Sequence, residues 1–217
     1  MHLVLIESLG NQQYIFSTNR LRENVGASHL LYRMGTQCVL DAVATVTGER
    51  SLWSEVPAEV RKALVDSERN RPIEGADTLV EVIYAASGTA LLLTKDRDVA
   101  VEIVSLVTRD SLKSTPGLQV SGVVSEDFEW DRVALWDINA RLHTRFEETR
   151  RLLPGPAQRF RHLPFVAPCA VSGLPGSKSK VRQEGNRRTE EIVSAVSLAK
   201  RESYPQAADR FKAMFPG

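Results

Sequence analysis

The sequence is poor in cysteine and has no long apolar run. Only two cysteines, Cys38 and Cys169, occur among 217 residues, so we expect no disulfide framework and a reducing compartment. No run of about eighteen apolar residues occurs, and no basic segment followed by an apolar stretch begins the chain. These absences predict a soluble, cytoplasmic protein that has no membrane partner.

Strong net charge and metal-ligand spacing are also lacking. The 28 basic and 27 acidic residues leave a net charge of +1, which favours neither a nucleic-acid binder nor a membrane-surface protein. The four histidines, at positions 2, 29, 143 and 162, show no zinc-ligand spacing with one another or with Cys169. We therefore expect no zinc within the chain.

Hydrophobic periodicity in the first 127 residues alternates between strand and helix patterns. A helix that breaks at Gly26 and restarts with Ser28 as its N-cap is predicted after the first strand. A hairpin is predicted around Ser87 and Gly88. The predicted elements, in order, are a strand at 3–6, helices at 19–48 and 55–69, strands at 79–84 and 89–94, a helix capped by Asp96, and a strand at 117–126.

This βαββαβ order predicts an α+β, ferredoxin-like domain over residues 1–127, with inserted helices after the first one. The arrangement places the helices on one face of an antiparallel sheet. Because both hairpin strands are strongly apolar, we expect both to be central in the sheet.

Residues 128–217 predict a helical, loop-rich appendage. Residues 130–152 show an amphipathic helical pattern, whereas residues 154–188 hold five of the ten prolines and no clear period. Lys178, Lys180 and Arg182 lie in this predicted loop, and two helices are predicted at 190–201 and 205–214.

Three short stretches carry a resemblance to a known family. They are the run Glu-Ser-Leu-Gly-Asn-Gln-Gln-Tyr-Ile-Phe at 7–16, the Gly-Ala-Ser at 26–28 and the Tyr-Ala-Ala-Ser-Gly-Thr-Ala-Leu-Leu at 84–92. Together they resemble the palm domains of the large subunit of type III CRISPR effector complexes and, more distantly, palm nucleotidyl cyclases such as diguanylate cyclases. The Pro-Cys-Ala-Val-Ser-Gly-Leu-Pro stretch at 168–175 resembles the element between the two palms of such subunits.

The resemblance implies a metal-dependent reaction, but this sequence has only some of the metal-binding carboxylates that the reaction needs. An active palm of this kind holds two Mg²⁺ or Mn²⁺ ions between a carboxylate at the end of its first strand and acids in the hairpin turn. Glu7 matches the first position, but residues 85–89 carry no carboxylate, and Asp96 and Asp98 follow the second hairpin strand. The resemblance therefore implies a first, catalytically degenerate palm.

Such a palm would have a nucleotide such as ATP as its ligand and a second palm as its partner. The second palm would lie in a longer chain or in a homodimer. The sequence ends where a second palm would be expected to follow.

Each candidate residue has a functional and a structural interpretation. Glu7 is a candidate metal ligand, or it caps the amides of the turn that follows it. Gly26 and Ser28 are candidate nucleotide contacts, or they form a helix break with an N-cap. Ser87 and Gly88 allow a nucleotide to approach closely, or they form a plain hairpin turn.

The basic residues Lys178, Lys180 and Arg182 are candidates for RNA binding, or they belong to a solvated loop. Three functions are therefore open. We expect a degenerate palm of a prokaryotic antiviral-defence protein, which binds a nucleotide or packs against an active palm. The alternatives are a nucleotidyl cyclase that makes cyclic nucleotides as a dimer and uses Glu7, and a structural or RNA-binding subunit.

Overall fold

The computed structural model describes residues 1–54, 56–75, 77–130, 132–154, 159–184 and 187–214, without the side chains of 181–184, 187, 188 and 214. The chain divides into two compact units, and each is described by itself. Unit 1 consists of Met1–Leu9, Leu31–Lys113 and Leu118–Leu153, and unit 2 of Gly10–Leu30, Ser114–Gly117 and Pro154–Gly217. This division differs from the expected boundary at residue 127.

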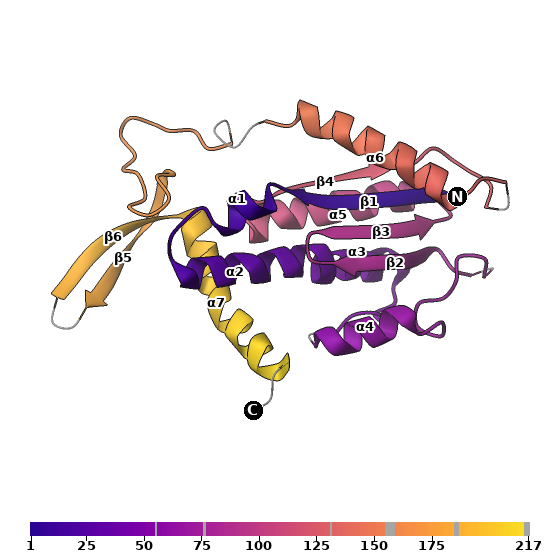
Figure 1. Cartoon of the computed structure of the whole chain (residues 1–217), viewed down its shortest axis with the longest axis horizontal. Coiled ribbons are helices and arrows are strands. Elements are labelled where there is room, and N and C mark those ends of the chain that lie inside the picture. Colours follow the sequence, from indigo (N-terminus) through magenta and orange to yellow (C-terminus); the bar gives the residue numbers. More distant parts are fainter. Residues whose placement is uncertain (55, 76, 131, 155–158, 185–186, 215–217) are drawn as a thin grey trace. The chain divides into compact units, whose positions relative to one another are not determined.

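Unit 1 contains a four-stranded antiparallel sheet in the order β2-β3-β1-β4 (Figure 1). Its strands are β1 (His2–Leu9), β2 (Val80–Ala86), β3 (Thr89–Thr94) and β4 (Gln119–Val124). The mixed α+β class is confirmed. The expectation that both hairpin strands are central is wrong, because β2 lies at the edge and exposes Ile83 and Tyr84.

One face of this sheet is covered by α6 (Leu135–Leu152). Ile138, Leu142 and Phe146 recur every four residues and form a single apolar stripe on the helix. They pack in one core cluster with Leu3 and Leu5 of β1, which are fully buried. The amphipathic pattern over residues 130–152 therefore identifies a helix whose apolar face is buried by the sheet.

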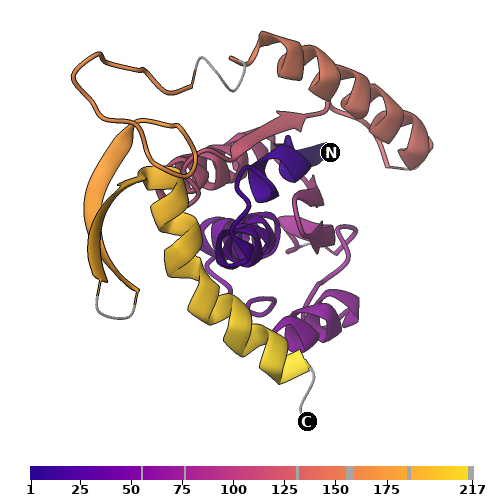
Figure 2. The ribbon, with the colours of Figure 1, turned by 60° about the vertical axis from the view of Figure 1, so that its left-hand side comes forward.

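The opposite face is covered by three further helices of unit 1. These are η1 (Arg33–Cys38), which is a π-helix, α3 (Val39–Thr47) and α5 (Arg97–Ser114). A Cβ at Gly122 of β4 would meet both Val104 of α5 and Ile6 of β1, so strand and helix approach closely there. Helices thus lie on both faces of the sheet, as Figure 2 shows. The helices η1, α3 and α5 share one face, as expected for residues 1–127, and the other face is covered by α6, which lies in the region expected to be an appendage.

The predicted helix break at Gly26 is also wrong. The helix α2 (Leu21–Tyr32) passes through Gly26 and Ser28 and continues directly into η1 and α3. Ser28 is therefore an exposed residue inside a helix and does not cap one. The helix predicted over 55–69 is the shorter α4 (Pro57–Val65), and residue 55 lies outside the described residues.

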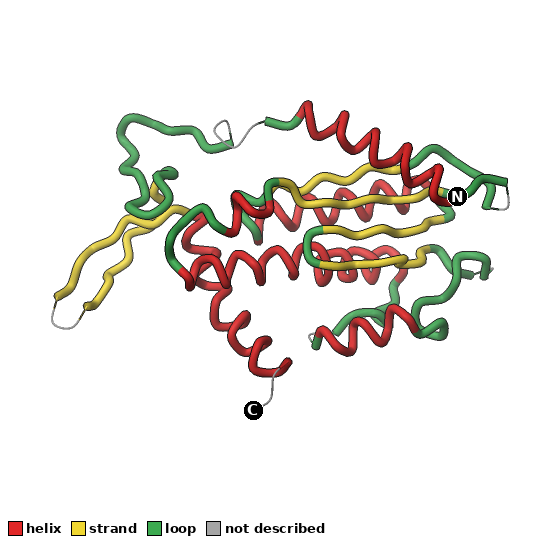
Figure 3. Tube along the Cα trace, viewed as in Figure 1, coloured by secondary structure: helices red, strands yellow, loops and turns green. Residues whose placement is uncertain are grey.

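Unit 2 combines the short helix α1 (Asn11–Ile15) and the first part of α2 with a hairpin and the helix α7 (Ala195–Met214). The hairpin consists of β5 (Gly176–Glu184) and β6 (Arg187–Ser194) (Figure 3). The loop predicted up to residue 188 and the helix predicted from residue 190 are therefore wrong. One helix replaces the two predicted ones, because Pro205 lies inside α7 without ending it. Among the helices in the described ranges, none has the length and hydropathy needed to cross a membrane.

The stripe on α6 provides a test of the core of unit 1. Phe146 is 1% exposed, whereas Trp136 on the same helix is 72% exposed. We expect Phe146→Ala to lower the free energy of unfolding by about 3–5 kcal/mol, because it leaves a cavity against β1. Trp136→Ala is the matched control and should change it by less than about 0.5 kcal/mol. Urea denaturation measures both, and equal losses would contradict this packing.

Candidate functional site

The candidate site in unit 1 is a row of four positions that crosses the sheet. Glu7 of β1 pairs with Thr89 of β3 on one side and with Ser121 of β4 on the other, and Thr89 pairs in turn with Ala86 of β2. Residues that pair directly across strands point to the same face of a sheet. The row therefore presents one carboxylate, two hydroxyls and one methyl group to a single face.

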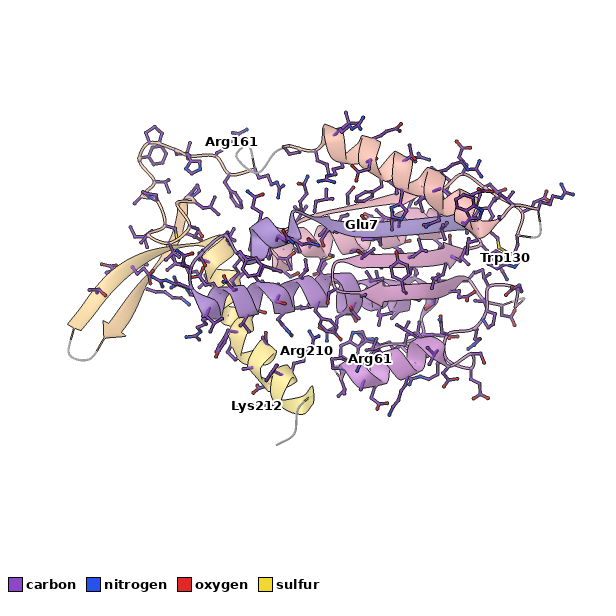
Figure 4. All side chains as sticks on the ribbon, in the orientation of Figure 1. Glu7, Arg61, Trp130, Arg161, Arg210 and Lys212 are labelled. Atoms are coloured by element: carbon purple, nitrogen blue, oxygen red, sulfur yellow. The ribbon has the colours of Figure 1, made fainter. Side chains whose placement is uncertain are left out.

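Glu7 is half-buried on the face that α6 covers, and Figure 4 labels it on β1. Burial raises the pKa of the Glu7 carboxyl above its ordinary value. On α6, His143 opposes this rise, Glu147 adds to it and Arg150 opposes it. Burial also raises the pKa of the Tyr84 phenol on β2, and the nearby Glu7 raises it further.

The hairpin turn next to this row is held by close backbone contacts. The Gly88 carbonyl accepts hydrogen bonds from the amide of Ser8, at 2.7 Å, and from its hydroxyl, at 3.0 Å. Gly88 has a φ of 91°, which favours glycine. Gly35 of η1 lies against the same turn, because a Cβ there would overlap the Ala86 carbonyl and the Gly88 amide. The structure thus places Ser87 and Gly88 beside Glu7, with Ser87 exposed.

The role of Gly35 was missed from the sequence. A glycine within an apolar helical pattern is a weak signal, and its significance depends on the distant hairpin that approaches it. The π-helical turn around Gly35 is the local departure from α-helix that often accompanies functional positions.

The residues of the row do not fit a two-metal centre. Mg²⁺ and Mn²⁺ need several charged oxygen ligands, but the strands beside Glu7 supply only the hydroxyls of Thr89 and Ser121. Asp96 caps the start of α5, where its carboxylate accepts the Asp98 amide at 2.6 Å, beyond the opposite end of β3 from Glu7. Within the described residues, no three His, Cys, Asp or Glu side chains gather in a way that could hold a metal.

Two further candidates, Gly26 and Ser28, belong to unit 2 and lie inside the helix α2. A Cβ at Gly26 would overlap the Lys200 carbonyl, so Gly26 lets α2 pack closely against α7. Neither residue lies at a helix N-terminus, where backbone amides would be free to bind a phosphate. The expected phosphate contact therefore lacks its structural basis.

Unit 2 contains a buried cation that the sequence did not reveal. The ammonium group of Lys200 donates hydrogen bonds to the Tyr14 carbonyl and, at 2.7 Å, to the Ser17 hydroxyl. It also lies 4.3 Å from the centre of the Tyr14 ring. Burial lowers the pKa of Lys200 to about 8, and the nearby Glu23 opposes this shift.

Next to Lys200, Arg201 joins two buried carboxylates. It contacts Glu23 at 2.7 Å and Glu191 of β6 at 3.1 Å, and Arg20 contacts the same Glu191 at 2.7 Å. The Glu23 side chain is completely buried and that of Glu191 nearly so. Because a buried carboxylate is costly unless it is paired, this network fixes α2, β6 and α7 relative to one another within unit 2.

The basic residues predicted to bind RNA lie on β5. Lys178, Lys180 and Arg182 alternate along the strand, and Lys180 and Arg182 pair with Glu191 and Thr189 of β6. Lys178 is exposed, and Lys180 lies 3.5 Å from the Glu202 carboxylate. The side chain of Arg182 lies outside the described residues.

No protein-family model matches this chain. No curated protein matches it either.

The row makes a testable prediction about metal binding. Thr89→Asp places a second carboxylate directly across from Glu7, so we expect Mn²⁺ affinity to rise by about tenfold or more over the original protein. Thr89→Asn introduces a side chain with the shape of aspartate but without its charge, and it should leave the Mn²⁺ affinity unchanged. Combining Thr89→Asp with Glu7→Gln should remove the gain. Mn²⁺ titration followed by electron paramagnetic resonance measures the affinity of all four proteins. A gain in affinity that survives Glu7→Gln would contradict the pairing of Glu7 with Thr89.

Lys200 predicts a dependence of stability on pH. Between its folded pKa of about 8 and its ordinary value of 10.5, the unfolded chain binds more protons at this residue than the folded chain. Stability from this group therefore rises with pH in that window. We expect the free energy of unfolding, relative to Lys200→Met, to increase by on the order of 3 kcal/mol from pH 7 to pH 10.5. Denaturant unfolding at several pH values measures it, and a constant or falling difference would refute the assignment.

Proposed function

We propose that this chain is a non-catalytic palm domain, similar to the first palm of type III CRISPR large subunits, which packs against an active palm in a prokaryotic antiviral-defence protein. The strand order supports this proposal. In a ferredoxin-like βαββαβ domain, β3 lies between β1 and β2, and β4 flanks the other side of β1. The order β2-β3-β1-β4 agrees with that arrangement.

The observation that carries the proposal is the composition of the row around Glu7. A carboxylate near the end of a central strand, beside a glycine-containing hairpin turn, supports the likeness to a palm. Thr89 and Ser121 hold the neighbouring positions, and Ala86 holds the end of β2. A row with one carboxylate lacks the charge needed to hold two metal ions.

The exposed edge strand β2 supports the second part of the proposal, that the chain packs against another domain. Ile83 and Tyr84 expose part of their apolar surface on this strand, and the adjoining Ser87 is exposed at the turn. The Asn70 side chain pairs with both the amide and the carbonyl of Val82, so a neighbouring domain would cover the part of the edge between Ile83 and the turn at Ser87. A second palm docked at this edge would lie next to the Glu7 row.

The proposal is tested with ATP and Mn²⁺. We expect the purified chain to form no oligomeric or cyclic nucleotide from ATP, as measured by chromatography of the reaction products. Glu7→Gln should give the same result as the original sequence, because Glu7 has no catalytic partner in the row. A Mn²⁺-dependent product that disappears in Glu7→Gln would overturn the proposal in favour of a cyclase.

A further inference from the structure

Four small polar side chains in unit 2 form two pairs with the same spacing along the chain, and none of them belongs to the candidate site described above. Cys169 and Ser172 are separated by two residues, and so are Ser194 and Ser197. The first pair lies in the turn that precedes β5, and the second spans the end of β6 and the first turn of α7. Two such pairs are the usual sequence pattern of a four-ligand zinc site when all four residues are cysteine.

The structure brings the two pairs together. The Cys169 sulfur lies 3.9 Å from the Ser197 hydroxyl oxygen, and the Ser172 and Ser194 hydroxyl oxygens lie 3.0 Å apart. Cys169, Ser194 and Ser197 are at most 2% exposed. In a tetrahedral site with zinc-sulfur bonds of about 2.3 Å, neighbouring ligand atoms are about 3.8 Å apart. The distance between Cys169 and Ser197 is therefore close to that of two ligands in a zinc site, whereas Ser172 and Ser194 lie closer together, at the distance of a hydrogen bond.

The environment of Cys169 favours a negatively charged sulfur. Burial alone would raise its pKa, but hydrogen bonds from the Ser172 hydroxyl and from the amides of Ser172, Val171 and Ser194 outweigh burial and lower the pKa to about 6. Backbone amides that point at a cysteine sulfur stabilise a thiolate whether or not a metal is bound.

The hydroxyls complete the cluster by hydrogen bonding. The Ser194 oxygen accepts the Ser197 amide at 3.2 Å and thereby caps the start of α7. The Ser172 oxygen accepts the amide of Leu174 at 3.4 Å. Serine hydroxyls are poor zinc ligands compared with thiolate or imidazole, so three of the four positions lack the chemistry that zinc requires.

We propose that Cys169, Ser172, Ser194 and Ser197 form the scaffold of a four-ligand zinc site in which hydrogen bonds take the place of the metal. The cluster joins the turn at 168–175 to the junction of β6 and α7, as a structural zinc would. Unit 2 then folds without metal, and cysteines in place of the three serines, with the small movement apart of Ser172 and Ser194 that zinc requires, would supply the missing ligands.

The test restores the missing ligands. The triple variant Ser172→Cys, Ser194→Cys, Ser197→Cys, kept reduced, should bind about one Co²⁺ per chain and show the absorption of tetrahedral thiolate coordination. Zn²⁺ should displace the Co²⁺. The original protein should bind none and should melt at the same temperature with and without a chelator.

Two further variants keep this test decisive. Ser28→Cys, Ser87→Cys, Ser177→Cys adds three cysteines at exposed positions and should show no tetrahedral signal. Ser172→Cys, Ser197→Cys retains the Ser194 cap, so it should fold even if the triple variant does not, and should bind Co²⁺ through three thiolates. Folded cluster variants that bind no Co²⁺, or an original protein that a chelator destabilises, would overturn the proposal.

Discussion

The structure of unit 1 depends on the alternation of side chains along β1, which is hydrogen-bonded to a neighbouring strand on both edges. A strand that is paired on both sides cannot slip by one residue without exchanging its two faces. Leu3 and Leu5 therefore face α6 together with Glu7, while Ile6 lies toward α5. The same alternation that buries the core also aligns the row that would have to hold a metal.

This constraint makes the fold of the sheet independent of the side-chain chemistry of the row. The turn of the β2–β3 hairpin is fixed by Ser8 and Gly35 through backbone contacts, and none of these contacts needs a carboxylate. Alanine, threonine and serine occupy the row beside Glu7, and the strands pair through their backbones at these positions. No second carboxylate on these strands stands directly opposite Glu7, so the pairing involves no repulsion between like charges.

Local patterns predicted the elements of unit 1 better than those of unit 2. The apolar runs of β1, β3 and α6 are strong because each is buried by a partner. The strands β5 and β6 are rich in charge and pair mainly with each other, so their sequences lack the apolar signal of a strand. The role of Gly26 could not be predicted, because it is set by the backbone of Lys200, far away in the sequence. Of the candidate site, Glu7 and the turn at Ser87 and Gly88 were predicted from the sequence. The places of Gly35 and Ser121 beside them depend on contacts between distant segments, which only the structure shows.

The central claim is that the row around Glu7 does not hold a metal ion. The most direct measurement is paramagnetic broadening of amide signals in the ¹⁵N-labelled protein as Mn²⁺ is added. The account predicts that the amides of Glu7, Thr89 and Ser121 broaden no more than those of exposed carboxylates elsewhere on the surface. Selective broadening of these three amides at low Mn²⁺ concentration would show a bound ion at the row and would contradict the account.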